Sequence, residues 1–188
     1  MELLLGLLLL FAGTGVCVYL VMVYNGLISL RNEIDRAWSN VDVLLKQRHD
    51  ELSNLVETCK GYLQHEREVF GEVARARSLY SEAATVQQKA EADDSARAAT
   101  RSLLLVAEGY PQLKADRIFQ WLEKRISQLE EQIADRREFY NEVVKIYNTR
   151  LQAIPDVYVA LVMRMPPVSY SRRCSANFLE PLFPQHRP

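Results

Sequence analysis

Two arginines stand at positions where the neighbouring sequence places apolar side chains. Over residues 27–62, apolar residues recur at alternating intervals of three and four, and Arg48 occupies one of these positions. The same spacing recurs over residues 113–154, where we place Arg136 on the apolar stripe. A guanidinium in such a stripe could take part in catalysis, bind an anionic ligand inside a helix bundle, or pair with a buried carboxylate.

Structural pairing is the favoured interpretation of both arginines. Asp42, Asp50 and Glu142 lie within reach along the same helices and could neutralise the charge. A buried ion pair fixes the register between packed helices more than it adds stability. The alternative is a ligand site in the core of the bundle, which would use the same guanidinium groups.

The histidines and cysteines form no metal-binding or nucleophile motif. Lys46 stands three residues before His49, and Tyr62 three before His65, so the Glu-x-x-His signature of di-iron bundles is missing. The sequence also lacks a zinc-binding His-Glu-x-x-His helix, a phosphate-binding loop and a Gly-x-Ser-x-Gly elbow. Cys59 falls on the apolar stripe, where an inert buried thiol is expected. We therefore predict no catalytic residue, no metal, no cofactor and no enzymatic activity.

Long helices are the elements that must position these residues. Intervals of three and four are typical of a helix that packs one face against other helices. No proline precedes Pro111, so the first part of the chain is free to be helical. The expected helices cover residues 27–62, the stretch after Gly61, 84–108 and 113–154.

Two apolar stripes define the faces that should pack in the core. The first comprises Leu27, Leu30, Ile34, Trp38, Val41, Leu45, Leu52, Leu55, Cys59 and Tyr62, with Arg48 among them. The second comprises Ile118, Leu122, Ile126, Leu129, Ile133, Tyr140, Val143, Tyr147 and Leu151, with Arg136 among them. No strand pattern occurs before residue 156, which predicts an all-α protein.

The N-terminal segment is long and apolar enough to cross a membrane. Residues 3–23 read LLLGLLLLFAGTGVCVYLVMV, and no charged residue occurs between Glu2 and Arg31. As a helix this stretch is about 30 Å long, the thickness of the hydrocarbon core of a bilayer. A cleavable signal peptide would begin with basic residues and have a shorter apolar core. We therefore predict an uncleaved single-span anchor over residues 1–24, with residues 3–23 in the lipid bilayer.

The charges that follow the span give an expected orientation. Arg31, Arg36, Lys46 and Arg48 come after it, while the leading tail carries only an acid, so the positive-inside rule places the bundle in the cytoplasm. Acidic and basic residues are otherwise balanced, with a net charge of −1, which argues against a nucleic-acid partner. Three widely spaced cysteines suit a reducing compartment. We expect a single-pass protein of the cell (inner) membrane.

The C-terminal tail follows the last predicted helix. Val157–Met165 is apolar but too short to span a bilayer. This run either packs on the end of the bundle, which is favoured, or lies at the membrane surface with Arg164, Arg172 and Arg173 near lipid head groups. Poor order is expected beyond Pro166.

Three separate blocks of the sequence resemble the LemA family of proteins. They are YNGLISLRNEIDRAWSNVDVLLKQRHDELSNLVETCKGYLQHE at residues 24–66, VAEGYPQLKAD at 106–116, and IADRREFYNEVVKIYNTRLQAIP at 133–155. With the N-terminal span, the similarity covers about residues 1–160. The resemblance implies a membrane-anchored, up-and-down bundle of four helices, whose second helix follows a bend near residues 61–65. It brings no enzymatic activity and links the chain to relatives associated with the biogenesis of membrane organelles.

Polar residues that match the family within these blocks are candidate functional positions. They are Asn25, Arg31, Asn32, Asp42, Arg48, Asp50, Asn54, Glu66, Tyr110, Arg136, Arg137, Tyr140, Asn141, Tyr147 and Asn148. One departure is ELSNLV at residues 51–56, where the family has a proline in an L-I-P-N-L-V stretch; its absence predicts a straighter first helix.

The predicted fold class is therefore all-α, with an N-terminal transmembrane helix followed by an antiparallel up-and-down bundle of three to four long helices. The parts are the anchor at residues 1–24, the LemA-like bundle at 25–155 and the tail at 156–188. We predict a structural, scaffolding or self-assembling role at the membrane, with the protein itself, another membrane protein, or both as partners. The alternative is a sensor or regulatory adaptor, whose polar bundle residues bind a ligand or a membrane-protein partner.

Overall fold

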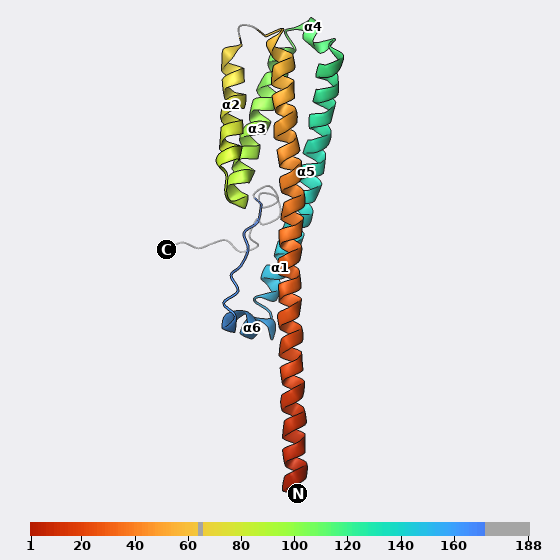
Figure 1. Ribbon diagram of the computed structural model, residues 1–188, viewed down its shortest axis with the longest axis vertical. Coiled ribbons are helices and arrows are strands. Elements are labelled where there is room, and N and C mark those ends of the chain that lie inside the picture. Colours follow the sequence, from red (N-terminus) through yellow and green to blue (C-terminus); the bar gives the residue numbers. More distant parts are fainter. Residues whose placement is uncertain (64–65, 172–188) are drawn as a thin grey trace, which may run out of the picture.

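Helix α1 (Glu2–Lys60) is the axis of the molecule and continues without a break from the candidate span into the bundle (Figure 1). The computed structural model describes residues 1–63 and 66–171, so His65 and residues 172–188 lie outside the described part. Side chains 1–22 of α1 are exposed, and from Val23 onward one face is buried. Within the described residues, α1 is the one helix long and apolar enough to cross a membrane.

Three further long helices complete an antiparallel up-and-down bundle: α2 (Arg67–Glu82), α3 (Val86–Ala107) and α5 (Arg117–Arg150). Successive helices run in opposite directions, and the short helix α4 (Pro111–Lys114) joins α3 to α5 at the end far from the N-terminus (Figure 1). The predicted all-α class and the bundle are confirmed, since the described residues contain helices and no strand.

The helices begin and end where the sequence supplies caps and turns. Thr85 caps α3 in a capping box with Gln88, and the Asp116 carboxylate caps α5 by accepting hydrogen bonds from the N–H groups of Ile118 and Phe119. Helix α1 ends at Lys60 and α2 begins at Arg67, so the bend favoured by the family resemblance is a break between two helices.

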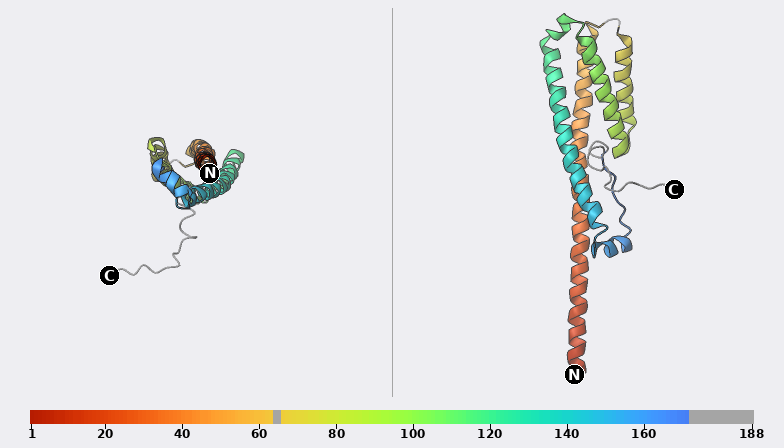
Figure 2. Two further views of the ribbon diagram at one scale, coloured as in Figure 1. Left: turned by 90° about the horizontal axis from the view of Figure 1, so that it is seen from below. Right: turned by 180° about the vertical axis from the view of Figure 1, so that it is seen from behind.

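Two apolar clusters form the core of the bundle. The upper cluster contains residues of all four long helices, including Leu52, Val73, Leu103 and Phe119. The lower cluster lies mainly between α1 and α5, which pack along each other. Its buried members are Ile34, Ala37, Val41, Leu45, Ile133, Tyr140, Val143, Val144 and Tyr147. The α2–α3 hairpin covers only the upper part of the α1–α5 pair (Figure 2).

On α5 the buried face is rotated relative to the predicted stripe. Arg136 is exposed and Arg137 is 3% exposed, so the second arginine of the core is Arg137 and the prediction for Arg136 was wrong. Relative to Ile133, residue 137 lies about 40° around the helix and residue 136 about 60° to the other side, because each residue turns about 100°. Ile118 was also wrongly predicted to be buried, since Phe119 takes its place in the core.

One predicted member of the first stripe is likewise exposed. Tyr62 comes after the end of α1 at Lys60, so the helical spacing no longer applies to it, and Leu63 is buried instead. The hydroxyl of Tyr62 donates a hydrogen bond to the Asp116 carboxylate, 3.1 Å away.

The chain beyond α5 turns back and packs against the bundle. Helix α6 (Asp156–Val162) lies against α1, where Val159 and Ala160 pack on Val23 and Leu27. Residues 166–171, which we call the strap, then run back along α5 on the side covered higher up by the α2–α3 hairpin (Figure 2). The sequence predicted poor order beyond Pro166, but the strap forms specific hydrogen bonds.

Candidate functional site

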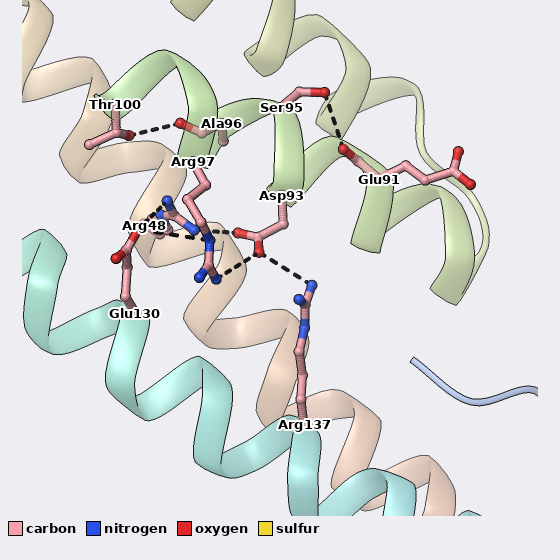
Figure 3. A network of polar contacts seen from close by, with 9 residues as sticks. All are labelled: Arg48, Glu91, Asp93, Ser95, Ala96, Arg97, Thr100, Glu130 and Arg137. Atoms are coloured by element: carbon pink, nitrogen blue, oxygen red, sulfur yellow. Dashed lines mark hydrogen bonds and ion pairs between the residues drawn. The ribbon is translucent and has the colours of Figure 1, made fainter. Parts of the chain in front are cut away.

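Arg48 pairs with carboxylates from two other helices. Its side chain is fully buried, with Nη1 donating to Oδ1 of Asp93 on α3 at 2.7 Å and Nη2 donating to Oε1 of Glu130 on α5 at 2.8 Å (Figure 3). None of the expected partners Asp42, Asp50 and Glu142 is among the ion pairs of Arg48 in the described residues. The guanidinium thus joins three helices at one level.

Asp93 is the centre of a larger ionic layer, formed by Arg48, Asp93, Arg97, Glu130 and Arg137. Its second carboxylate oxygen lies 3.3 Å from Nη2 of Arg137 and 3.6 Å from Nη2 of Arg97 (Figure 3). Asp93 is 0% exposed, so its charge depends on these guanidinium groups for stabilisation. The five side chains carry three positive and two negative formal charges.

The alanine-rich sequence of α3 allows Asp93 to reach the other helices. Ala90, Ala92, Ala96 and Ala99 are buried around it, and such small side chains let α3 pack closely on its neighbours. A short carboxylate side chain can then meet a long arginine extended from α1. The ionic layer separates the upper apolar cluster from the lower one, because Leu52 belongs to the upper cluster and Leu45 to the lower.

His49 lies beside the ionic layer and is 5% exposed. Its ring stacks on Tyr80 of α2, with ring centroids 4.1 Å apart, and both ring nitrogens lack a hydrogen-bond partner within the described residues. Burial lowers the pKa of His49 to about 4, opposed by the Asp93 carboxylate and reinforced by the Arg48 and Arg77 guanidiniums. The imidazole is therefore neutral in the folded protein near neutral pH.

His49 should make the stability of the bundle depend on pH. As the pH falls from 6.5 to 4, the unfolded chain binds a proton at His49 before the folded chain does, so the free energy of unfolding should fall by about 3 kcal/mol over this range. Urea unfolding of the wild type and of His49→Phe, which retains a ring for stacking on Tyr80, measures this contribution. The free energy of unfolding of the variant should fall less steeply as the pH is lowered. If it falls as steeply as that of the wild type, His49 is not the group responsible for the pH dependence.

Asp42 forms a separate polar contact at the edge of the same region. It accepts hydrogen bonds from the Tyr80 hydroxyl at 3.2 Å and from Lys89 Nζ at 2.5 Å. Burial, reinforced by the Asp42 charge, raises the pKa of Tyr80. Asp42 thus links α1 to α2 and α3, although not through Arg48.

The strap is held by four family-matching residues of α5. The Asn148 amide exchanges two hydrogen bonds with the backbone of Val168, at 2.8 and 3.0 Å, and the Asn141 amide does the same with Ser171, at 3.1 and 2.8 Å. The hydroxyls of Tyr147 and Tyr140 donate to the carbonyl oxygens of Pro166 and Ser169.

Simple geometry explains why this pairing works. Two asparagines seven residues apart on one face of a helix are separated by about 10 Å along its axis. Three residues of extended chain, the interval from Val168 to Ser171, also span about 10 Å. The two amides therefore meet the backbone of the strap at matching intervals, and Val168 packs against the lower apolar cluster.

The remaining predicted positions do not converge on a site. Asn25, Asn32, Asp50 and Asn54 are exposed, and Arg31 is partly exposed. Glu66 accepts a hydrogen bond from the Tyr110 hydroxyl at 3.4 Å, near the far end of the bundle. Arg136 lines an open surface groove between α1 and α5. The other residues that line this groove are Asn40, Val43, Leu44, Gln132 and Asp135.

Sequence reasoning missed Asp93, Arg97 and Glu130. A signal for Asp93 was present, because it is a charged residue three positions from the alanines at 90 and 96, on the face that those alanines bury. The binding site of the strap also had a signal in the sequence. The dipeptide Tyr-Asn occurs at residues 140–141 and again at 147–148, which places two identical pairs on one face of the helix.

These features define a class of membrane-associated helical proteins. A long apolar N-terminal helix continues into a helical bundle, and ion pairs between polar residues join the helices in its core. The chain belongs to the LemA family, whose model matches residues 37–176. The match includes the whole ionic layer, both strap-binding asparagines and the strap itself.

Two relatives come from Paramagnetospirillum magneticum. They are Magnetosome protein MamQ 1 and Magnetosome protein MamQ 2. Each is 22% identical to this chain over 192 residues, an alignment that covers 88% of this chain and 71% of the relative.

Proposed function

We propose that the protein is a membrane-anchored scaffold, a non-enzymatic helical bundle that assembles with copies of itself or holds other membrane proteins. The ionic layer is the observation that carries this proposal. Its buried charges join α1, α3 and α5 at one level, an arrangement that fixes helix register rather than adding stability. A bundle with one register presents one fixed surface to a partner.

Helix α1 supports the same proposal from the side of the membrane. It belongs both to the candidate span and to the bundle, so the bundle stands at a defined height above the bilayer. Arg31, Arg36, Lys46 and Arg48 follow the span, and by the positive-inside rule these basic residues support a cytoplasmic bundle. The similarity to proteins named for the magnetosome supports a search for partners among membrane proteins.

Crosslinking in intact cells tests the proposal. A photoreactive phenylalanine analogue placed at Phe139, which is 43% exposed, or at Trp121, which is 59% exposed, would sample partners without disturbing the core. We expect products at multiples of the chain's mass, or products that contain one membrane protein, identified by mass spectrometry after detergent extraction. Exclusive recovery of the uncrosslinked chain from both positions would contradict a scaffold.

A sensor is the second candidate, favoured by access to the ionic layer from solvent. The side chain of Glu130 is 34% exposed and lines a surface groove together with Arg97, Arg101 and Ser127. An anionic ligand in this groove could compete with Glu130 for the arginines. Arg48→Glu distinguishes the two candidates, since loss of folded protein supports structural pairing, whereas a folded variant with a lost partner response supports a sensor.

A further inference from the structure

Helix α6 lies where the candidate span leaves the membrane. Val159 and Ala160 pack on Leu27 and on Val23, the last residue of the apolar segment 3–23, and Val23 and Leu27 are the first buried residues of α1. The helix runs crosswise to α1 at the lower end of the bundle, and among the described residues only those of α1 continue below it (Figure 1). This position is the boundary between the candidate span and the bundle.

The outward face of α6 and of its flanking turns is apolar. Tyr158, Leu161 and Val162 are 63%, 72% and 81% exposed, and Ile154 and Met163 beside them are also exposed. All five side chains lie within residues 154–163, on α6 and the turns that flank it. Exposed apolar residues concentrated in this way indicate an interaction surface.

The charge of α6 is hidden from this outward face. Asp156, the one acidic residue of the helix, is 7% exposed. It forms an ion pair with Arg150, in which Nε of Arg150 donates a hydrogen bond of 2.6 Å to Oδ2 of Asp156. Gly26 of α1 makes room for the Arg150 guanidinium, because a Cβ at that position would lie 3.1 Å from Nη1. The charge of Asp156 is therefore neutralised by Arg150 beside α1, and no carboxylate of α6 points outward.

We propose that the outward face of α6, formed by Ile154, Tyr158, Leu161, Val162 and Met163, is inserted into the interfacial region of the lipid bilayer. Helix α6 lies where the exposed apolar surface of α1 ends, because it packs on Val23 and the side chains of residues 1–22 are exposed. A short helix with an apolar face at that depth meets the boundary between head groups and acyl chains. The exposed Arg164 follows directly, where a guanidinium can contact lipid phosphates.

This surface gives the protein a second membrane contact beside the span. The span alone leaves α1 free to rotate about its axis and to tilt in the bilayer. A second point of insertion, offset from that axis, defines which face of the bundle is turned toward the membrane surface. The inference therefore goes beyond the proposed scaffold and holds whether the bundle assembles with itself or with another protein.

The test uses the full chain, with its three native cysteines replaced by serine, in phosphatidylcholine vesicles. A single cysteine at Leu161 carries an environment-sensitive fluorophore, and a matched control carries it at Ile118, which is 61% exposed at the opposite end of the bundle. Quenching by acyl-chain nitroxide lipids reports contact with lipid, and quenching by iodide reports contact with water. A third probe at Leu8 tests the span independently.

At Leu161 we expect blue-shifted emission, at least twofold stronger nitroxide quenching than at Ile118, and protection from iodide. Equal quenching by iodide at the two positions would overturn the proposal. Protection from both quenchers at Leu161 would also overturn it, because a second protein copy would then cover the face. If the probe at Leu8 shows no lipid contact, the prediction that residues 3–23 span the bilayer is wrong, and the proposal for α6 fails with it. Circular dichroism of each labelled chain confirms that the bundle is folded.

Discussion

Replacing Asp93 with alanine is expected to destabilise the folded bundle by about 3–5 kcal/mol, the cost of removing one partner from a buried ion pair. Asp93 faces Arg48, Arg97 and Arg137, and the variant leaves these three guanidiniums with Glu130 alone among the carboxylates of the ionic layer. Urea unfolding of the full chain in detergent micelles, followed by circular dichroism, measures the change.

The neighbouring residue provides a matched control. Asp94 is exposed on the same helix, and its replacement by alanine changes helix propensity in the same way. Asp94→Ala should alter the free energy of unfolding by no more than about 1 kcal/mol, as for exposed charged residues in general. If Asp93→Ala is no more destabilising than Asp94→Ala, Asp93 does not neutralise the buried arginines of the ionic layer.

A double substitution of Asn141 and Asn148 by alanine is expected to release the strap. Four hydrogen bonds to the backbone of Val168 and Ser171 would be lost. At about 0.5–1 kcal/mol each, their loss corresponds to about 2–4 kcal/mol of local stability, or about 30- to 900-fold faster opening of the strap. Amide hydrogen exchange at Val168 and Ser171 measures this directly.

The control for the strap is Asn40→Ala, which removes an exposed asparagine of α1. Exchange at the two strap amides should remain slow in this variant. The α2–α3 hairpin should retain its protection in the double variant, because the strap contacts α5 and the lower apolar cluster. Unchanged exchange at Val168 and Ser171 in the double variant would show that the asparagines do not hold the strap.

The helices could be predicted from the sequence because their information is local. The apolar spacing around Leu45 and Leu52 identified α1, and the charge-free run at residues 3–23 identified the candidate span. The same spacing identified Arg48 as a buried cation. It could not distinguish Arg136 from Arg137, because two adjacent residues lie on either side of the centre of the same helical face.

The partners of Arg48 could not be predicted from spacing because they come from other helices. Asp93 lies 45 residues further along the chain and Glu130 lies 82 residues further. Their meeting depends on how closely α3 packs, which its alanines control. The strap was missed for a different reason: its contacts are made by its backbone, so its own side chains show no regular pattern.

With the candidate span in a bilayer, the uninterrupted α1 would transmit any change in the tilt of the span to the far end of the bundle. The distance along the helix from Val23 to Lys60 is about 55 Å, since each residue adds about 1.5 Å. In a bilayer, a change of about 10° in the tilt of the span would move the far end of the helix sideways by about 10 Å. Span tilt changes with bilayer thickness. A helix without a hinge therefore converts a small change in lipid thickness into a displacement as wide as a neighbouring helix.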